Sequence, residues 1–132
     1  MPDLPKQNKQ HEANFGIVFR EWISNNPQIT GSYELKDTKG ENYLNFSEIS
    51  EDQITYALLI NSRKGVLMRV AGLKGEPDYI YMCQEPAYIV IKYPSSFSII
   101  TIGTFLMEKE RSKRKSLTES QAEAISTITV QL

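Results

Sequence analysis

The chain has 132 residues and a formal net charge of −1, with 40% hydrophobic and 23% charged residues. This length suits one domain with one core, and the composition is ordinary for a soluble globular protein. No apolar run approaches the roughly 20 residues that a membrane-spanning helix needs. The polar segment 1–10 lacks the apolar stretch of a signal peptide. We therefore expect a flexible segment over 1–10, a single domain over 11–132, and no membrane partner.

A single cysteine and a single histidine restrict the chemistry that the chain can carry out. One cysteine, Cys83, excludes an internal disulfide and fits a reducing cytoplasm, which is the expected location. One histidine, His11, argues against a histidine-based zinc site and leaves no Cys/His or Ser/His pair with independent support. A metal site in this chain would be built from oxygen ligands, which favours Mg²⁺ or Mn²⁺.

The first half of the chain alternates between helical and strand patterns. Apolar residues recur at helical spacing over 11–25, and Pro27 ends that helix. A strand is predicted over 32–36, followed by a polar loop over 37–42 that contains Gly40. Ser50 and Gln53 match a capping box, so a second helix is expected to start there.

The second half of the chain is predicted to be rich in strands. Four apolar runs separated by turn residues indicate strands over 66–70, 78–83, 87–93 and 97–102. A second capping box at Ser116 and Glu119 predicts a short helix to about residue 126. The strands at 32–36 and 66–70 flank a helix, which favours a crossover and parallel pairing. We expect an α/β (α+β) fold with a central mixed sheet of about five strands flanked by helices.

The tripeptide Glu34-Leu35-Lys36 is the main functional signal. Side chains at i and i+2 of a strand point to the same face, so Glu34 and Lys36 should face one spot while Leu35 turns into the core. A carboxylate and an ammonium group held together in this way can hold Mg²⁺ beside a phosphate and stabilise the charge that builds there. The alternative is a charge pair of little energetic consequence on a solvent-facing strand.

The order of these motifs resembles the PD-(D/E)XK nuclease superfamily, and within it the RecU-type Holliday junction resolvases and small phage relatives. The resemblance covers roughly residues 11 to 106. It rests on a helix bearing a glutamate, a strand with Glu-x-Lys, a loop, and a helix that begins with a glutamine. It implies a restriction-endonuclease-like fold and a metal-dependent endonuclease that acts on DNA, with structured or branched DNA as the substrate and DNA recombination as the setting. A homodimer is a further expectation.

The resemblance also implies roles for individual residues. Glu34 would bind the divalent metal, and Lys36 would orient the attacking water or stabilise the phosphorane. Glu12, in the first helix, would be a supporting metal or water ligand. Gln53 would assist near Lys36 or contact the scissile region. Two simpler alternatives stay open: Gln53 acts only in the capping box, and Glu12 is only a favourable acid in the first turn.

This chain departs from the superfamily pattern upstream of Glu34. The superfamily carries an aspartate on an earlier strand, and no aspartate lies between residues 4 and 36. Asp78, which follows Pro77, is expected to supply that carboxylate from a later strand, although it could be a plain turn residue. In a second alignment with the superfamily, Asp78 is the first acid of the motif and Val90-Ile91-Lys92 takes the place of Glu-x-Lys. Because Val90 cannot bind a metal, this alignment predicts an inactive site. We therefore prefer the first alignment, which places the motif at Glu34-Leu35-Lys36.

Basic residues gather in two segments that could contact phosphates. Five fall within seven residues near the C-terminus: Lys109, Arg111, Lys113, Arg114 and Lys115. Arg69 and Lys74 lie around a predicted loop over 71–77. Such clusters set the affinity and salt dependence of nucleic-acid binding, but not sequence recognition. The alternative is a solvated charged surface.

Three functional hypotheses follow from these observations. The first is a Mg²⁺- or Mn²⁺-dependent deoxyribonuclease with Glu34, Lys36, Gln53 and Glu12 as catalytic residues and Glu34, Asp78 and Glu12 as metal ligands. The second is a nucleic-acid-binding module of nuclease-like fold that has lost catalysis. The third is a protein interaction domain that uses its aromatic-rich strands.

Overall fold

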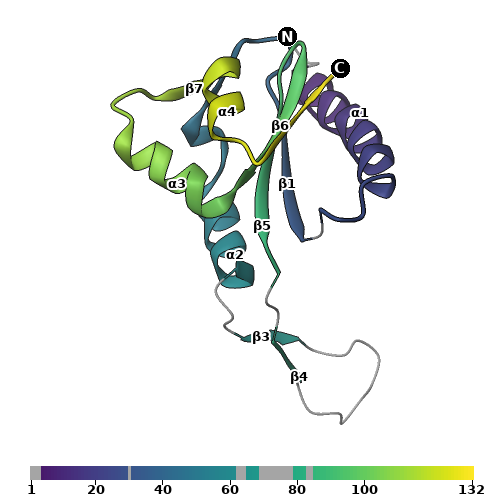
Figure 1. Cartoon of the computed structure of the whole chain (residues 1–132), viewed down its shortest axis with the longest axis vertical. Coiled ribbons are helices and arrows are strands. Elements are labelled where there is room, and N and C mark those ends of the chain that lie inside the picture. Colours follow the sequence, from purple (N-terminus) through teal and green to yellow (C-terminus); the bar gives the residue numbers. More distant parts are fainter. Residues whose placement is uncertain (1–3, 30, 62–64, 69–78, 83–84) are drawn as a thin grey trace.

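A computed structural model describes the chain except for residues 1–3, 30, 62–64, 69–78 and 83–84. For residues 4–12, 65–68 and 79–82 it describes the backbone but not the side chains. The fold is α+β (Figure 1). The helical elements are α1 (Leu4–Ser24), the 3₁₀ turn η1 (Phe46–Glu48), α2 (Glu51–Asn61), α3 (Ile102–Arg111) and α4 (Glu119–Ile125). The strands are β1 (Ser32–Asp37), β2 (Tyr43–Asn45), β3 (Gly65–Met68), β4 (Tyr79–Met82), β5 (Ala87–Lys92), β6 (Ser96–Thr101), β7 (Ser116–Thr118) and β8 (Ile128–Gln131).

The central sheet is mixed, as the sequence predicts, and its strand order is β1-β5-β6-β8. β1 pairs with β5 in parallel, whereas β6 is antiparallel to both β5 and β8. Within the described residues this sheet has four strands rather than the expected number of about five. Two further pairs, β2 with β7 and β3 with β4, form separate two-stranded sheets.

The predicted pairing of the strand at 66–70 is wrong. β3 does not join β1 but pairs antiparallel with β4, and Figure 1 shows this hairpin projecting from the end of the central sheet. The parallel partner of β1 is β5, with Glu34 opposite Ile89 and Lys36 opposite Ile91. The crossover rule requires only a long connection between parallel strands. Here that connection includes both α2 and the hairpin.

Several element boundaries also differ from the prediction. α1 begins at Leu4 rather than near His11, because Pro5 is tolerated in the first turn of a helix. α3 directly follows β6 and was not expected; Thr101 caps it by accepting a hydrogen bond from the Thr104 N–H at 3.3 Å. The second capping box lies two residues later than predicted, at Thr118 and Gln121.

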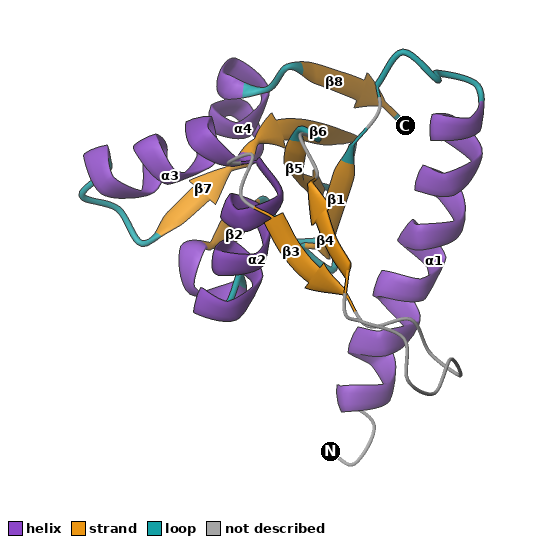
Figure 2. Ribbon diagram, turned by 90° about the horizontal axis from the view of Figure 1, so that it is seen from below, coloured by secondary structure: helices purple, strands orange, loops and turns teal. Residues whose placement is uncertain are grey.

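The two faces of the central sheet carry different helices. Figure 2 shows α1 on one side and α2, α3 and α4 on the other. Successive side chains of a strand point to opposite faces of the sheet. On β5, Val90 therefore packs with Phe15 and Phe19 of α1, while Ile89 and Ile91 pack with α2 and α3. We call these the α1 face and the α2 face.

The start of β1 depends on a glycine. Gly31 has a φ of +148°, and a Cβ atom there would lie 2.2 Å from the Pro86 carbonyl oxygen. That oxygen accepts a hydrogen bond from the Ser32 N–H at 2.9 Å, which is the first contact between β1 and the segment entering β5. Only glycine permits this close approach at such a φ. Gly31 therefore sets the register that places Glu34 and Lys36.

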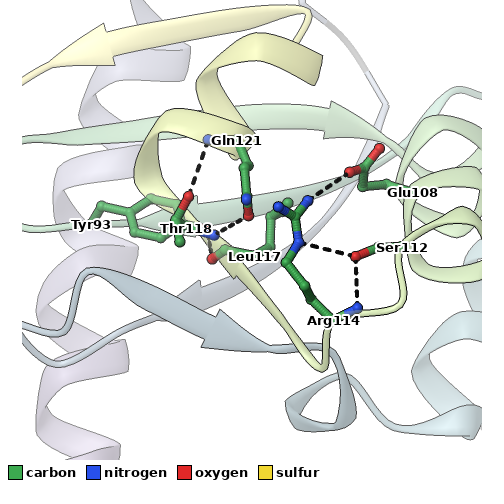
Figure 3. Close-up of polar contacts among 7 residues, drawn as sticks. All are labelled: Tyr93, Glu108, Ser112, Arg114, Leu117, Thr118 and Gln121. Carbon is green, nitrogen blue, oxygen red and sulfur yellow. Dashed lines mark hydrogen bonds and ion pairs between the residues drawn. The ribbon is translucent and has the colours of Figure 1, made fainter.

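The C-terminal part of the chain is joined to the sheet by a buried tyrosine. Tyr93 follows β5, is fully buried, and donates a hydrogen bond from its hydroxyl to the Leu117 carbonyl oxygen at 2.8 Å (Figure 3). Burial raises the pKa of Tyr93 well above its usual range, with smaller contributions from Glu119 and Glu48. The hydroxyl is therefore kept neutral and able to donate, which holds β7 and the start of α4 against the sheet.

Candidate functional site

Glu34 and Lys36 lie together on the α2 face, as the sequence predicts. Both occupy alternate positions of β1, beside the fully buried Ile89 and Ile91 of β5. Their neighbours Tyr33 and Leu35 turn to the other side and pack against the apolar cluster of the α1 face. The strand therefore divides its side chains by chemistry, with the charged pair on one face and the apolar pair on the other.

Gln53 joins this pair from the first turn of α2. Its backbone N–H donates to Ser50 Oγ at 3.2 Å, and its side-chain Oε1 accepts from the Ser50 N–H at 2.9 Å. Its Nε2 group donates to Glu34 Oε1 at 2.6 Å. One side chain therefore performs both the capping role and a contact with Glu34. The capping box fixes the Gln53 amide, and the amide in turn orients the Glu34 carboxylate.

The charges at this site are partly removed from water. Lys36 Nζ lies 3.8 Å from Glu34 Oε1, and the Lys36 and Glu34 side chains are 15% and 34% exposed, respectively. A lysine ammonium group is strongly hydrated, so holding it at this exposure costs solvation free energy that the nearby carboxylate offsets. A cation in this state interacts more strongly with a phosphate than a fully solvated one would.

A small pocket of about 70 Å³ opens beside the carboxylate. Its lining includes Glu34, Gln53 and three tyrosines, namely Tyr33, Tyr56 and Tyr88. Tyr33 and Tyr88 stack with ring centroids 5.6 Å apart and an interplanar angle of 14°. Burial raises the pKa of Tyr33, with further contributions from Tyr88 and Glu85. Tyr33 and Tyr88 border the pocket but pack with the apolar cluster of the α1 face, and the pairing of β1 with β5 is what brings them together.

The donor set at Glu34 is compatible with a divalent metal. Mg²⁺ is commonly held by one or two carboxylates together with substrate phosphate oxygens and water. Glu34 supplies one carboxylate, whose Oε1 atom lies 3.8 Å from Lys36 Nζ. Within the described parts of the chain, no group of three or more histidine, cysteine, aspartate or glutamate side chains could hold a metal ion.

The other two predicted metal ligands lie outside the part of the chain that the structure describes. Asp78 is not among the described residues, and the side chain of Glu12 is not described. The helix that carries Glu12, α1, packs through Phe15 and Phe19 on the opposite face of the sheet from Glu34. Both assignments therefore stay predictions.

Two further residues of the predicted motifs have structural roles. Val90 is fully buried on the α1 face, so the alignment that uses Val90-Ile91-Lys92 has no metal ligand at that position. Asp37, which ends β1, is 4% exposed, and its Oδ1 accepts a hydrogen bond from the Lys39 N–H at 2.7 Å. Asp37 therefore stabilises the turn in which Lys39 adopts a φ of 58°.

The C-terminal basic residues lie at the end of α3 and in the loop before β7. Lys109 and Arg111 occupy the last turn of α3. Arg114 is held in place, because its Nε donates to Ser112 Oγ at 3.2 Å and its guanidinium lies 3.7 Å from Glu108 (Figure 3). Arg69 and Lys74 lie outside the described residues. The described residues of this cluster thus lie in the last turn of α3 and in the loop after it, and α3 is one of the helices that pack on the α2 face.

Comparisons with known proteins supply no further assignment. No protein-family model matches the chain, and no curated protein or solved structure does so either. Within the described residues, none of the helices is both long and apolar enough to span a membrane.

Proposed function

We propose that this protein is a metal-dependent deoxyribonuclease with a restriction-endonuclease-like fold, acting on structured or branched DNA. The observation that carries the proposal is that Glu34 lies within hydrogen-bonding distance of Gln53 and within ion-pair distance of Lys36. A carboxylate, a partly desolvated ammonium group and a fixed amide form a set suited to phosphodiester hydrolysis.

Each residue has a defined part in this proposal. Glu34 would hold Mg²⁺ or Mn²⁺, which would polarise a phosphoryl oxygen and lower the pKa of a bound water. Lys36 would meet the negative charge that develops on the phosphate. Gln53 would position Glu34 through its Nε2 hydrogen bond. Asp78 and Glu12 would complete the ligand set, and Arg69 and Lys74 would contact DNA phosphates. A homodimer would supply the two sites that symmetric cuts in a branched substrate require.

The test is cleavage of end-labelled four-way junctions, duplexes and single strands with Mg²⁺ or Mn²⁺. Wild type is compared with Lys36→Met and Glu34→Gln, and with Lys39→Met and Glu41→Gln as controls in the turn after β1. We expect the two site variants to lose about 10²- to 10³-fold in cleavage rate, by analogy with removal of a group that stabilises transition-state charge. The controls should cleave like wild type. Equal cleavage by Glu34→Gln and wild type would refute the proposal.

One observation favours a second function, nucleic-acid binding without hydrolysis. No aspartate lies between residues 4 and 36, where the nuclease superfamily carries a metal-binding carboxylate. A binding module would retain salt-sensitive affinity for DNA in the presence of a chelator, and wild type would leave every substrate intact. Calorimetric detection of a Mg²⁺ or Mn²⁺ site that Glu34→Gln removes would exclude this second function.

A further inference from the structure

An exposed aromatic ring lies beside the proposed nuclease site. Among the aromatic side chains that the structure describes, Tyr56 of α2 is the most exposed, at 61%. The rings of the α1 face pack against one another, but in the described part of the chain no ring packs against Tyr56. The core therefore gains little from this ring, and both its faces and its edge are available to a ligand.

The first turns of α2 place Tyr56 next to the carboxylate of Glu34. Tyr56 follows Gln53 by three residues, so the two side chains are neighbours on the helix surface, about 4.5 Å apart along its axis. Gln53 Nε2 donates to Glu34 Oε1 at 2.6 Å. All three residues line the small pocket of about 70 Å³. Tyr56 is therefore carried by the same part of the helix that orients the Glu34 carboxylate.

Tyr56 and Lys36 lie on opposite sides of Glu34. The part of β1 that lines the pocket runs from Ser32 to Glu34, whereas Lys36 lies two residues beyond Glu34 in the other direction. Within the described residues, β1 is an edge strand of the central sheet, so a ligand can follow it without crossing another strand. A DNA strand with a phosphate at Glu34 and Lys36 would therefore bring an adjoining nucleotide to Tyr56.

The pocket beside Tyr56 favours a flat, uncharged group over a second phosphate. Among the described residues that line it, Glu34 is the only charged one, so the pocket itself offers a phosphate no cationic partner. Its volume of about 70 Å³ is well below the roughly 300–1,000 Å³ of small-molecule sites, so it cannot enclose a ring system. A ligand ring would instead lie over the exposed ring of Tyr56, at the mouth of the pocket. A nucleobase is flat and uncharged, as this position requires.

We propose that Tyr56 stacks on the base of the nucleotide next to the scissile phosphate. This inference rests on the proposed function for its substrate class. Every base has a π-face, so such stacking tolerates any base. A base inside a duplex is covered on both faces by its neighbours, so the base on Tyr56 must be unpaired, at a branch point or at a strand end. Tyr56 would thereby favour structured or branched DNA over continuous duplex without reading its sequence.

The test measures binding of a fluorescent oligothymidine strand by anisotropy, with EDTA present so that the strand stays intact. Tyr56→Ala removes the ring, and Tyr56→Phe keeps it. We expect Tyr56→Ala to bind about 10-fold more weakly than wild type, the scale of one lost stacking contact, and Tyr56→Phe to bind within about twofold of wild type. Tyr43→Ala is the matched control, because Tyr43 is also exposed, at 42%, but lies on β2 outside the pocket. It should bind like wild type.

A strand of equal length that is abasic at every position separates stacking from contacts with phosphates. This strand keeps its phosphates but has no base, so Tyr56→Ala should bind it like wild type. Tyr56→Ala should also bind a continuous duplex like wild type. Equal losses for Tyr56→Ala on the intact and abasic strands would mean that the ring acts through the fold, and would overturn the proposal. A loss for Tyr56→Phe or Tyr43→Ala as large as that for Tyr56→Ala would overturn it as well.

The stacking proposal and the nuclease proposal can fail separately. If wild type shows the expected binding pattern but cuts no substrate with Mg²⁺ or Mn²⁺, the nuclease proposal fails and the stacking contact stands. If wild type cuts junctions and Tyr56→Ala binds the intact strand like wild type, the stacking proposal fails and the nuclease activity stands. If wild type binds no DNA at low salt, both proposals fail.

Discussion

The two faces of the central sheet show how one strand can serve both stability and chemistry. On the α1 face, β1 contributes Tyr33 and Leu35 to an aromatic cluster built around Phe19 and Phe97. On the α2 face the same strand contributes Glu34, which accepts a hydrogen bond from Gln53, and Lys36, which pairs with Glu34. Because the strand alternates with period two, the polar site is confined to one face and the apolar packing of the other face is undisturbed.

The difference between the faces implies a separation of mutational effects. Changes on the α1 face should alter the free energy of unfolding, and changes at the site should alter cleavage more than stability. Three predictions test this separation, and their expected effects on stability decrease in the order given.

The largest effect is expected for Phe19→Ala on the α1 face. Phe19 is 4% exposed and lies within ring contact of Phe15, Trp22, Tyr33 and Phe97. Removing the ring should lower the free energy of unfolding by about 3–5 kcal/mol, since lost burial and an unfilled cavity both contribute. Urea unfolding measures this loss. Ile17→Ala, on the same helix at a position 64% exposed, should cost less than about 0.5 kcal/mol. Similar losses for both variants would mean that α1 does not pack as described.

A smaller effect is expected where Gln53 meets Glu34. Gln53→Glu keeps the capping box, because glutamate is also accepted at this position, but replaces the Nε2 donor with a second carboxylate. We expect a loss of about 1–2 kcal/mol at pH 7 from the missing hydrogen bond and the like-charge contact. A double-mutant cycle with Glu34→Gln, followed by urea unfolding, should show that most of this loss disappears in the Glu34→Gln background. Additive losses would show that the two side chains do not interact in solution.

The smallest effect is expected at Glu119, which is remote from the site. Glu119 Oε2 accepts hydrogen bonds from Ser95 Oγ at 2.9 Å and Ser96 Oγ at 2.8 Å, and these link the β5–β6 turn to α4. Desolvation pushes its pKa upward, but the hydrogen bonds from Ser96 and Ser95 outweigh it and hold the pKa of Glu119 below 4.5. The folded state therefore favours the ionised form. Its stabilising contribution is present above the unfolded value of 4.5 and is lost as pH falls through the lower folded pKa.

The corresponding experiment compares Glu119→Gln with wild type by thermal unfolding across this pH range. The difference in Tm should be constant above about pH 5 and should shrink as the pH falls towards 3, because the carboxyl group is then protonated in both states. Glu123→Gln, an exposed acid on the same helix, serves as the control and should show a smaller difference at every pH. A Tm difference for Glu119→Gln that grows as the pH falls would contradict the assigned hydrogen bonds.

Local patterns predicted much of the secondary structure because they depend on near neighbours in the chain. The period-two placement of Glu34 and Lys36, the Ser50–Gln53 capping box and the strands around β5 and β6 were all recognisable from such patterns, and the structure confirms them. Failures occurred where tertiary context decided. The helical start of α3 at the end of β6, the short strands β2 and β7, and the edge strand β8 have weak local signals and depend on distant partners.

The side chains that could carry chemistry are recognisable from the order of residues alone: an acid and an amine on one side of a strand, a glutamine in a helix cap, and a run of basic residues. Spacing along the chain is enough for this, because strand and helix periods are local properties of the backbone. Three contacts depend on the packing of the whole chain: β5 is the parallel partner of β1, Gln53 reaches Glu34, and the loop over residues 112–115 joins η1 through the Phe46–Lys115 hydrogen bond. Those contacts join residues far apart in the chain, so they arise from the burial of two separate apolar faces rather than from any local pattern.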